Sequence, residues 1–456
     1  MNREARKVLL YEERQTQKIF RRGSNLGETH FLHLSDIHFR LRKHETLDLD
    51  KDLRTQLIAD AGVVVNQLTG PVKGILVTGD LAYSGKKEQY DNVAAWLKEL
   101  SAVLGCGPEQ VWVVPGNHDV DRDVIQNSTT LRDIREKLRN VPPEDLDWRL
   151  GEYLEDAQAG PMLLEPLLHY NSFAARYGRM SGDNLVGCTT SHDGLYWQDV
   201  VEVEGGYQIR LVGANSAVIS DANDNDENCK LVCGTHQLKA TLEDGVLNLL
   251  LCHHPPDWIR DADSIEDLLS NRFHVQLFGH KHVQRMRTID GKLRLSSGAA
   301  QPSRGERAWS PCYNFLSINF QIPDGKASVK VRQRNWDEST QSFAPRFRPS
   351  GEDFFEYNFE VGVPVQQEEL SAVESDRETT EDPVSDAEPQ LDVRKLVFDF
   401  YELPFHRRLE LGNRLGLLRG DDEDCSGFDL SRVILHRAKS EGLFERLRDS
   451  IDHLDI

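Results

Sequence analysis

Five apolar runs in this chain each lead directly into a short polar element, and this order limits the fold more than any other feature. Each run has the length and the apolar residues of a buried strand, and the five are HFLHLS (30–35), GILVT (74–78), VWVVP (111–115), VLNLLLC (246–252) and FHVQLFG (273–279). Helix-like stretches near residues 51–68 and 88–101 separate the first three runs. This alternation predicts an α/β fold whose polar residues gather where the strands end.

The polar elements supply carboxylate, amide and imidazole groups. In chain order they are SDIH (35–38), GD (79–80), GNHD (116–119), CHHP (252–255) and GHKH (279–282). Oxygen and nitrogen ligands of this kind suit divalent Mn, Fe, Zn and related ions. Two metals fit these ligands better than one. A carboxylate such as Asp80 can bridge two ions, and such a pair clamps the attacking and leaving oxygens of a hydrolysis.

These ordered elements resemble the signature of the calcineurin-like metallophosphoesterase superfamily, which reads DxH, GD, GNH(D/E), a His after a strand, and GHxH. The resemblance covers roughly residues 29–335. It implies an α/β fold in the form of a four-layer αββα sandwich, with two divalent metal ions in the loops at one edge. It also implies hydrolysis of a phosphoester by a hydroxide that bridges the metals. Manganese is the first expectation for the ions, and Fe, Zn, Ni and Mg are the alternatives.

The family's functional residues map onto this chain by position. The metal ligands are then Asp36, His38 and His282 for one ion, Asn117, His253 and His280 for the other, and Asp80 as the bridge. His118 resembles the family's imidazole that contacts the phosphate and protonates the leaving oxygen, a task for a side chain that titrates near neutrality. Asp119 has two candidate roles, which are to orient His118 and to brace its loop.

Two further histidines lie close to these elements in the sequence. His254 adjoins His253, but it should project to the other side of an extended chain. The family ligand also precedes the proline by two positions, which favours His253. His33 alternates with Leu32 and Leu34, as a packed strand residue does. We therefore prefer His253 as the ligand and interpret His33 as part of the core.

Composition divides the chain before its last 64 residues. Residues 366–392 contain ten acidic side chains against one arginine, which predicts an extended linker because charge repulsion and few apolar residues oppose folding. The expected organisation is an N-terminal extension (1–28), a metallophosphoesterase domain (29–340) with a helical insertion at about 121–190, an extension with the acidic linker (341–392), and a helical domain (393–456).

Later apolar runs at 209–216, 293–298, 315–320 and 327–331 complete the expected strands. The last of these runs have no helices between them. This spacing predicts a more antiparallel sheet in the second half of the domain.

The C-terminal segment 393–456 holds helix-like apolar patterns. It resembles the death-like, effector-associated adaptor domains that are fused to enzymes in bacterial conflict and signalling systems. The run from Tyr401 to Leu418 and the later AKSEGL (438–443) carry this resemblance. It implies a small all-α domain that recruits a protein partner. A bundle that only solubilises or dimerises the enzyme is the alternative.

The net charge of −21 restricts the partners of the chain, because its mean field repels polyanions except at a local positive site. Arg304, Arg307, Arg332 and Arg334 form either such a basic rim or a solvated edge. No stretch approaches the roughly 18 apolar residues of a membrane span. The first 28 residues hold no signal-like apolar run, and the seven cysteines form no CxxC pair. These features predict a cytoplasmic protein without a membrane partner.

Together the motifs predict a phosphodiesterase that acts on nucleotides or nucleic acid. The adaptor resemblance implies that it is recruited as an effector in a bacterial defence or signalling system. Two alternatives stay open, a non-hydrolytic metal- or nucleotide-binding adaptor and a phosphomonoesterase or protein phosphatase. The filled ligand positions favour an active enzyme, and the sequence leaves the oligomeric state undetermined.

Overall fold

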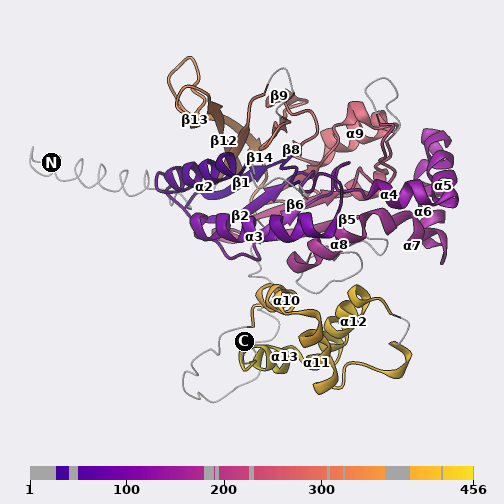
Figure 1. Ribbon diagram of the computed structural model, residues 1–456. Helices are drawn as coiled ribbons and strands as arrows, with labels where there is room; N and C mark the ends of the chain where they lie inside the picture. The colour runs from indigo at the N-terminus through magenta and orange to yellow at the C-terminus, as the bar shows by residue number, and fades with distance from the viewer. Residues whose placement is uncertain are drawn as a thin grey trace, which may run out of the picture.

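The protein is built around two seven-stranded sheets, with a group of helices from the C-terminal part of the chain beneath them (Figure 1). A computed structural model describes residues 27–40, 50–178, 189–190, 195–224, 231–303, 305, 309–321, 324–364, 391–422 and 425–454.

The first sheet has the strand order β13-β12-β11-β1-β2-β3, and β14 also pairs with β12. Its strands are β1 (Thr29–Leu34), β2 (Val72–Val77), β3 (Val111–Val113), β11 (Cys312–Gln321), β12 (Lys326–Asp337), β13 (Ser342–Pro345) and β14 (Phe355–Glu360). Strands β1, β2 and β3 are parallel, and β11 joins them antiparallel to β1.

The second sheet has the order β4-β5-β6-β7-β8-β10-β9. Its strands are β4 (Thr189–Thr190), β5 (Tyr196–Glu202), β6 (Gln208–Ala214), β7 (Val246–Cys252), β8 (Val275–Phe278), β9 (Arg285–Ile289) and β10 (Lys292–Ser296). The four central strands β6, β7, β8 and β10 are parallel, whereas β5 and β9 run antiparallel to their neighbours. The hydrophobic runs of β7 and β8 are buried along their whole length, as parallel strands covered on both faces are.

The two sheets pack face to face over a shared apolar core that includes Phe31, Leu76, Leu249 and Leu316. Helices α2 (Lys51–Val65) and α3 (Lys87–Leu104) cover the outer face of the first sheet, and α9 (Ala262–Arg272) covers that of the second. In α2 the buried positions Leu53, Leu57, Ala61 and Val64 recur every three to four residues and form one apolar stripe. The four-layer αββα sandwich is thereby confirmed.

The prediction of a more antiparallel sheet in the second half of the domain holds for its last strands, whereas β6, β7, β8 and β10 are parallel. Strands β11 to β14 are antiparallel, as expected, but they extend the first sheet, where Phe315 of β11 lies opposite Leu32 of β1. Local spacing does not show which sheet a strand joins, because that depends on long-range pairing. The sheet continues to Glu360, beyond the expected boundary at residue 340.

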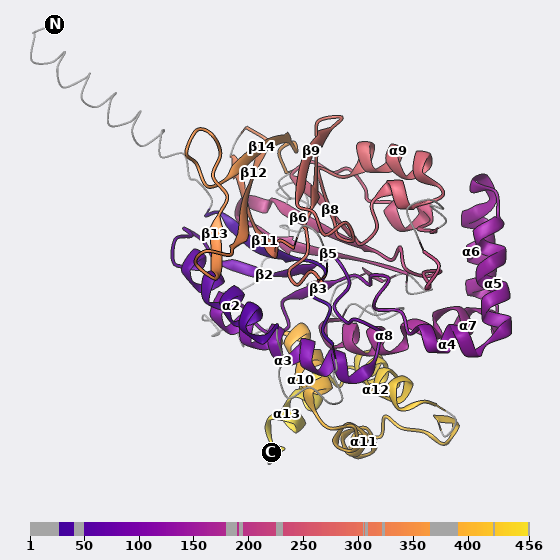
Figure 2. The same cartoon turned by 45° about the horizontal axis from the view of Figure 1, so that its top comes forward.

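Among the described residues between β3 and β5, five α-helices lie within the range expected for the insertion. They are α4 (Arg122–Asn127), α5 (Thr129–Asn140), α6 (Leu146–Glu155), α7 (Ala159–Leu164) and α8 (Leu168–Ala174). The side chains of Asp121 and Ser128 accept hydrogen bonds from the first turns of α4 and α5, which fixes where both helices begin. Figure 2 shows α5 and α6 at the far side of the sandwich from α2. Residues 179–188, the end of the expected insertion, lie outside the described residues.

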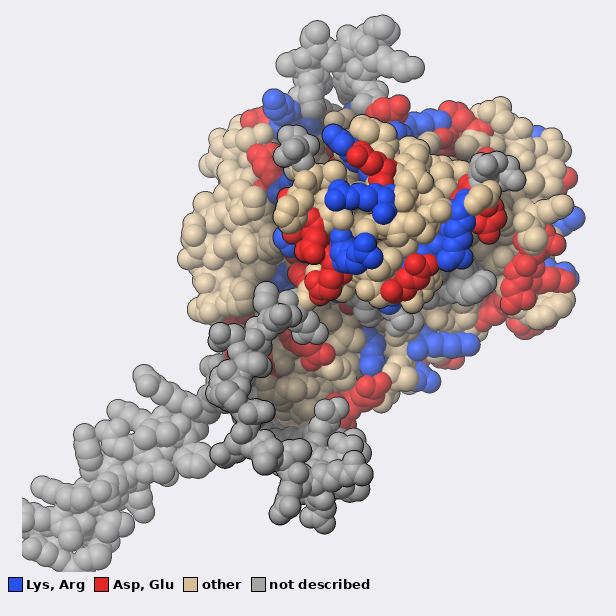
Figure 3. Space-filling model, turned by 90° about the horizontal axis from the view of Figure 1, so that it is seen from below, with Lys and Arg blue, Asp and Glu red and all other residues tan. Residues whose placement is uncertain are grey.

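The C-terminal part of the chain forms a separate helical bundle of α10 (Val393–Glu402), α11 (Phe405–Arg414), α12 (Gly427–Ser440) and α13 (Phe444–Asp452). Its core includes Leu396, Phe400 and Ile434, and it also takes in Ala175 from the end of the insertion. On the bundle side of the molecule, Lys and Arg lie interspersed with Asp and Glu rather than in one large patch (Figure 3). The acidic linker up to residue 390 lies outside the described residues.

None of the helices in the described part of the chain combines the length and the apolar character needed to cross a membrane.

Candidate metal centre

Five of the seven predicted ligands occupy strained backbone positions just beyond the ends of strands β1, β2 and β8. Asp36, His38, Asp80, His280 and His282 all have φ between 50° and 69°. They are five of the seven non-glycine residues with positive φ in the described part of the chain. Non-glycine residues avoid this region, and such strain concentrates at functional sites. The loops are tied together by backbone bonds, including one of 2.9 Å from the His38 amide to the Asp80 carbonyl.

Two glycines of the motifs are needed for close packing between these loops. A Cβ at Gly116 would overlap the Asp80 carboxylate, and a Cβ at Gly79 would overlap the His253 ring. Gly79 also has a φ of 90°, which favours glycine. The glycines therefore let side chains from separate strands approach one another.

The first predicted ligand set converges on a small volume. His282 Nε2 lies 3.2 Å from Asp36 Oδ1 and 3.3 Å from His38 Nε2. One ligand atom from each of these three residues lies within 4.8 Å of the others. Two imidazoles and one carboxylate thus point at the same place, which suits a divalent cation with nitrogen and oxygen ligands.

The second predicted set converges beside the first. Asn117 Oδ1 lies 3.1 Å from His253 Nε2 and 3.1 Å from His280 Nδ1. Asp80 lies between the two sets, with Oδ2 3.4 Å from His253 Nε2 and 3.9 Å from His38 Nε2. The bridging role of Asp80 stays a prediction.

The donor set around His253 tests whether these residues fit a cation. His253 Nδ1 lies 2.7 Å from the Thr78 carbonyl, which can only accept, so Nδ1 carries a proton. When the ring is neutral, Nε2 presents a lone pair toward the oxygens of Asn117 and Asp80, so that three acceptors face one point. Burial favours the neutral ring, but the Asp80 charge outweighs it and raises the pKa of His253 to about 10. The point between Asn117, His253 and Asp80 therefore requires a positive charge, and these residues fit a metal ion.

Three of the other ligands, His38, His280 and Asp36, have the protonation states that a metal needs. Burial lowers the pKa of His38 and of His280 to about 3, so both rings are neutral near pH 7. Burial opposes ionisation of Asp36, but the hydrogen bond and charge of His282 lower its pKa to about 2. Neutral imidazoles and ionised carboxylates are the forms that bind divalent ions.

His118 is held at the rim of the site by two backbone contacts. Its amide donates to Asp80 Oδ1 at 2.7 Å, and its Nδ1 donates to the Tyr83 carbonyl at 2.8 Å. The ring is only partly buried and lies 4.7 Å from the His38 ring, centroid to centroid. With Nδ1 occupied, Nε2 is the nitrogen available to a substrate.

The Asp119 carboxylate is bound to backbone amides of the site loops and to Tyr90. It accepts hydrogen bonds from the amides of Gly116, Leu81 and Ala82 and from the Tyr90 hydroxyl, at 2.9 to 3.3 Å. Burial, together with the Asp80 charge, raises its pKa to about 7. These contacts favour the loop-bracing role among the two that the sequence left open.

His254 lies nearer to the second ligand set than the sequence predicted. Its ring centroid is 4.6 Å from that of His280, and a ligand atom of His254 lies within 4.8 Å of those of His253 and His280. The chain turns after β7 and does not stay extended, so alternation along a strand no longer applies. His254 Nδ1 is engaged with Ser216 Oγ at 2.8 Å. His33, as expected, is a buried core residue and pairs with Thr78 Oγ1 at 3.0 Å.

The basic rim proposed from the sequence is partly structural. Arg334 is 8% exposed and forms an ion pair with Asp60, while Arg332 Nη1 donates to Ser317 Oγ at 2.8 Å. Arg304 and Arg307 lie outside the described residues.

Sequence reasoning missed two residues near His118. Tyr83 is 41% exposed with its ring 5.2 Å from that of His118, and the Arg40 guanidinium lies 4.1 Å above it. No motif marks either residue.

Comparison with known proteins gives two family matches and one curated relative. The calcineurin-like phosphoesterase family matches residues 29–284, and the GTPase-associated adaptor domain matches residues 392–453. An uncharacterized metallophosphoesterase-like protein of Bacillus subtilis, YydB, is 24% identical over 330 residues, which cover 68% of this chain and 62% of that protein. The aligned region thus spans about three fifths of that relative.

Two solved structures are among those to which the chain is similar. Vacuolar protein sorting 29 from Cryptosporidium parvum is 13% identical with a TM-score of 0.31, and the match covers 73% of this chain and 99% of that one. A putative 5′-nucleotidase from Staphylococcus aureus, in complex with alpha-ketoglutarate, is 10% identical with a TM-score of 0.30, covering 82% and 58%.

The first family match spans more than half of the chain and contains all five polar elements that converge in the structure. The C-terminal match coincides with helices α10 to α13 and confirms that they form an adaptor domain. This chain belongs to the calcineurin-like phosphoesterase family.

Proposed function

We propose that this protein is a phosphodiesterase with two divalent metal ions, manganese first among them, and that it acts on nucleotides or nucleic acid. The observation that carries the proposal is the convergence of two ligand sets around Asp80. We assign Asp36, His38 and His282 to one ion and Asn117, His253 and His280 to the other. Two such ions lower the pKa of a bound water and neutralise the phosphoryl oxygens.

The chain's own residues then orient the reaction. The Tyr83 carbonyl fixes the His118 ring through Nδ1, so that Nε2 can give a proton to the leaving oxygen. The Thr78 carbonyl fixes the tautomer of His253 in the same way. Asp119 holds the loops of Gly116 and Ala82 together, and this keeps His118 in position over Asp80.

Tyr83 supports a nucleoside as the leaving group. Its exposed ring lies beside His118, where the leaving group would depart, and the Arg40 guanidinium lies over it. Aromatic rings and guanidinium planes are the side chains on which nucleobases stack.

The adaptor domain supports recruitment by a protein partner, and we infer that the enzyme acts as a tethered effector in a bacterial defence or signalling system. The full chain should retain a partner from its native host through purification, and a chain that ends before residue 391 should not. If both forms copurify with the same proteins, the adaptor is not the recruiting element.

A screen of metals against substrates tests the catalytic proposal. Mn, Fe, Zn, Mg and Ni would each be combined with p-nitrophenyl phosphate, bis(p-nitrophenyl) phosphate, cyclic nucleotides, and single- and double-stranded DNA and RNA. We expect metal-dependent hydrolysis with a higher kcat/KM for diesters than for the monoester. A monoester preference would favour a phosphomonoesterase or protein phosphatase. Metal binding without turnover of any substrate would favour the non-hydrolytic adaptor.

A further inference from the structure

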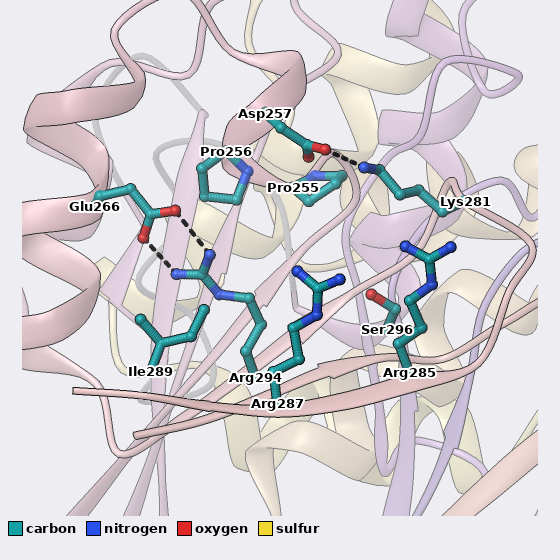
Figure 4. Close-up of a pocket in the computed structure, with 10 residues that line it drawn as sticks. All are labelled: Pro255, Pro256, Asp257, Glu266, Lys281, Arg285, Arg287, Ile289, Arg294 and Ser296. Atoms are coloured by element: carbon teal, nitrogen blue, oxygen red, sulfur yellow. Dashed lines mark hydrogen bonds and ion pairs between the residues drawn. The ribbon is translucent and has the colours of Figure 1, made fainter. Parts of the chain in front are cut away.

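A pocket of about 250 Å³ opens beside the proposed metal centre (Figure 4). Two of its walls continue the loops that hold the proposed ligands. Pro255 directly follows His253 and His254, and Lys281 lies between His280 and His282. The remaining walls come from α9 and from the hairpin of β9 and β10. The pocket and the metal centre thus share the edge where β7 and β8 end.

The charges that line this pocket are only partly compensated. Arg294 pairs with both carboxylate oxygens of Glu266, at 2.7 and 2.5 Å, and Lys281 pairs with Asp257. Arg285 and Arg287 make no side-chain hydrogen bond or ion pair with the described residues. Figure 4 shows both guanidinium groups extending from the strand toward the pocket. Two positive charges therefore remain to attract an anion.

The register of the hairpin places these arginines on one face. Arg285 and Arg287 alternate along β9, so both project to the same side. Arg287 lies opposite Arg294, and Arg285 lies opposite Ser296. Like charges directly opposite one another destabilise a strand pair. Glu266 already neutralises Arg294. A bound anion would in the same way neutralise Arg287 and so reduce the repulsion between the two arginines.

The arginines lie within reach of a substrate held at the metal centre. Arg285 is three residues beyond His282, and three residues span at most about 10 Å between Cα atoms. The long arginine side chain extends this range further. A group of the substrate that neighbours the reacting ester can thus contact the pocket.

We propose that Arg285 and Arg287 bind a second phosphate group of the substrate, one that lies outside the ester being cleaved. Guanidinium groups match phosphate oxygens with paired, charge-assisted hydrogen bonds. A nucleic-acid strand carries such a phosphate at every nucleotide, and a nucleoside polyphosphate carries one beside the reacting group. This proposal rests on the phosphodiesterase function and adds a substrate class to it, namely esters with more than one phosphate.

Binding without metal tests the pocket separately from catalysis. Fluorescence anisotropy would follow a fluorescein-labelled single-stranded oligothymidylate on the EDTA-treated full chain over a range of salt concentrations. We expect Arg285→Ala/Arg287→Ala to weaken binding about tenfold or more and to reduce the slope of log K against log salt by about 0.7, for one phosphate. Lys326→Ala/Arg348→Ala, which removes the same charge from exposed positions on β12 and on the connection between β13 and β14, is the matched control.

Kinetics of the metal-loaded enzyme give the second readout. The double variant should lose about tenfold in kcat/KM on the oligonucleotide and keep its wild-type rate on bis(p-nitrophenyl) phosphate, which has no second phosphate. If the double variant lost as much kcat/KM on ATP as on the oligonucleotide, nucleoside polyphosphates would be identified as the source of that phosphate. Unchanged oligonucleotide binding, or an equal loss on both diesters, would overturn the proposal. Inactivity of the wild-type chain with every metal would overturn the proposed function, while the anisotropy result would still decide the pocket.

Discussion

Arg394 of helix α10 forms a two-point ion pair with Asp199 of strand β5, at 2.9 and 3.1 Å. Asp199 is 3% exposed and also accepts a 2.6 Å hydrogen bond from Trp112 Nε1 of β3. The adaptor domain thus contacts both sheets at one buried point. Trp112 lies five residues before Asn117, so the docking site and the metal-site loop share strand β3.

Arg394→Ala should release the adaptor domain from the sandwich. The substitution leaves Asp199 buried without its cation, which costs about 3 kcal/mol. Amide hydrogen exchange over residues 393–402 should therefore accelerate. Lys395→Ala is the control, because its partner Asp399 lies on α10 itself and the pair is more exposed. Unchanged protection of α10 in Arg394→Ala would show that other contacts hold the domain.

His118→Ala should reduce turnover without unfolding the protein. Loss of a general acid lowers kcat by about 10² to 10⁴. The loss should be larger for a dinucleotide than for bis(p-nitrophenyl) phosphate, since p-nitrophenolate leaves more readily without a proton. His169→Ala, on helix α8, is the matched control. Equal losses on the two diesters would argue for a positioning role of His118 and against proton transfer.

Asp119→Ala should act mainly on stability. The substitution leaves three amides and one hydroxyl without their acceptor in a buried place, which lowers the free energy of unfolding by about 3 kcal/mol. Denaturant unfolding measures this loss. The pH dependence of kcat should keep its shape, because Asp119 does not contact the His118 ring. A shifted pH profile with unchanged stability would instead assign Asp119 to orienting His118.

Metal binding should stabilise the folded chain. A ligand that binds only the native state at 100 times its Kd adds about 2.7 kcal/mol to the free energy of unfolding. Tm should rise with added Mn and fall with EDTA. The rise should be largely lost in Asp80→Asn and kept in Asp263→Asn, which changes an exposed carboxylate on α9. A metal-induced shift of full size in Asp80→Asn would contradict the bridging role.

Acidification should destabilise the fold through His274. Burial, together with the Lys292 charge, lowers the pKa of His274 from 6.5 to about 4, and its Nδ1 accepts a 3.0 Å bond from the Asn248 amide. Between these pH values the unfolded chain binds more protons than the folded one, so stability rises with pH. The free energy of unfolding should fall by roughly 2 kcal/mol from this residue between pH 7 and pH 5.

His274→Phe removes this titration, and His169→Phe serves as its control. The slope of the unfolding free energy against pH, measured by denaturant melts, should be smaller in His274→Phe alone. Equal slopes in the two variants would show that His274 does not cause the effect.

Local patterns in the sequence predicted most of the residues of the candidate site. The seven proposed ligands follow apolar runs, and the motifs predicted that they gather where strands end. Their strands belong to two sheets, β1 to β3 in the first and β7 and β8 in the second, so the packing of the two sheets is what brings the ligands together. The strands that were missed lack such apolar runs. RMRTI of β9 carries polar residues in both halves of the alternation and is mostly exposed. FEYNFE of β14 does alternate between aromatic and polar residues, but it lies beyond the domain boundary expected at residue 340. The arginines of the proposed phosphate pocket lie on one of these strands.

The sequence by itself determined the family of this protein and the residues proposed as ligands, because residue type and order are local properties of five short segments. Only the tertiary structure decided three further points. It placed β11 to β14 in the first sheet, turned Asp119 toward the backbone of Ala82, and seated Arg394 against Asp199. Each depends on contacts between residues distant in the chain, and burial and hydrogen bonding select those contacts only once the whole fold has formed.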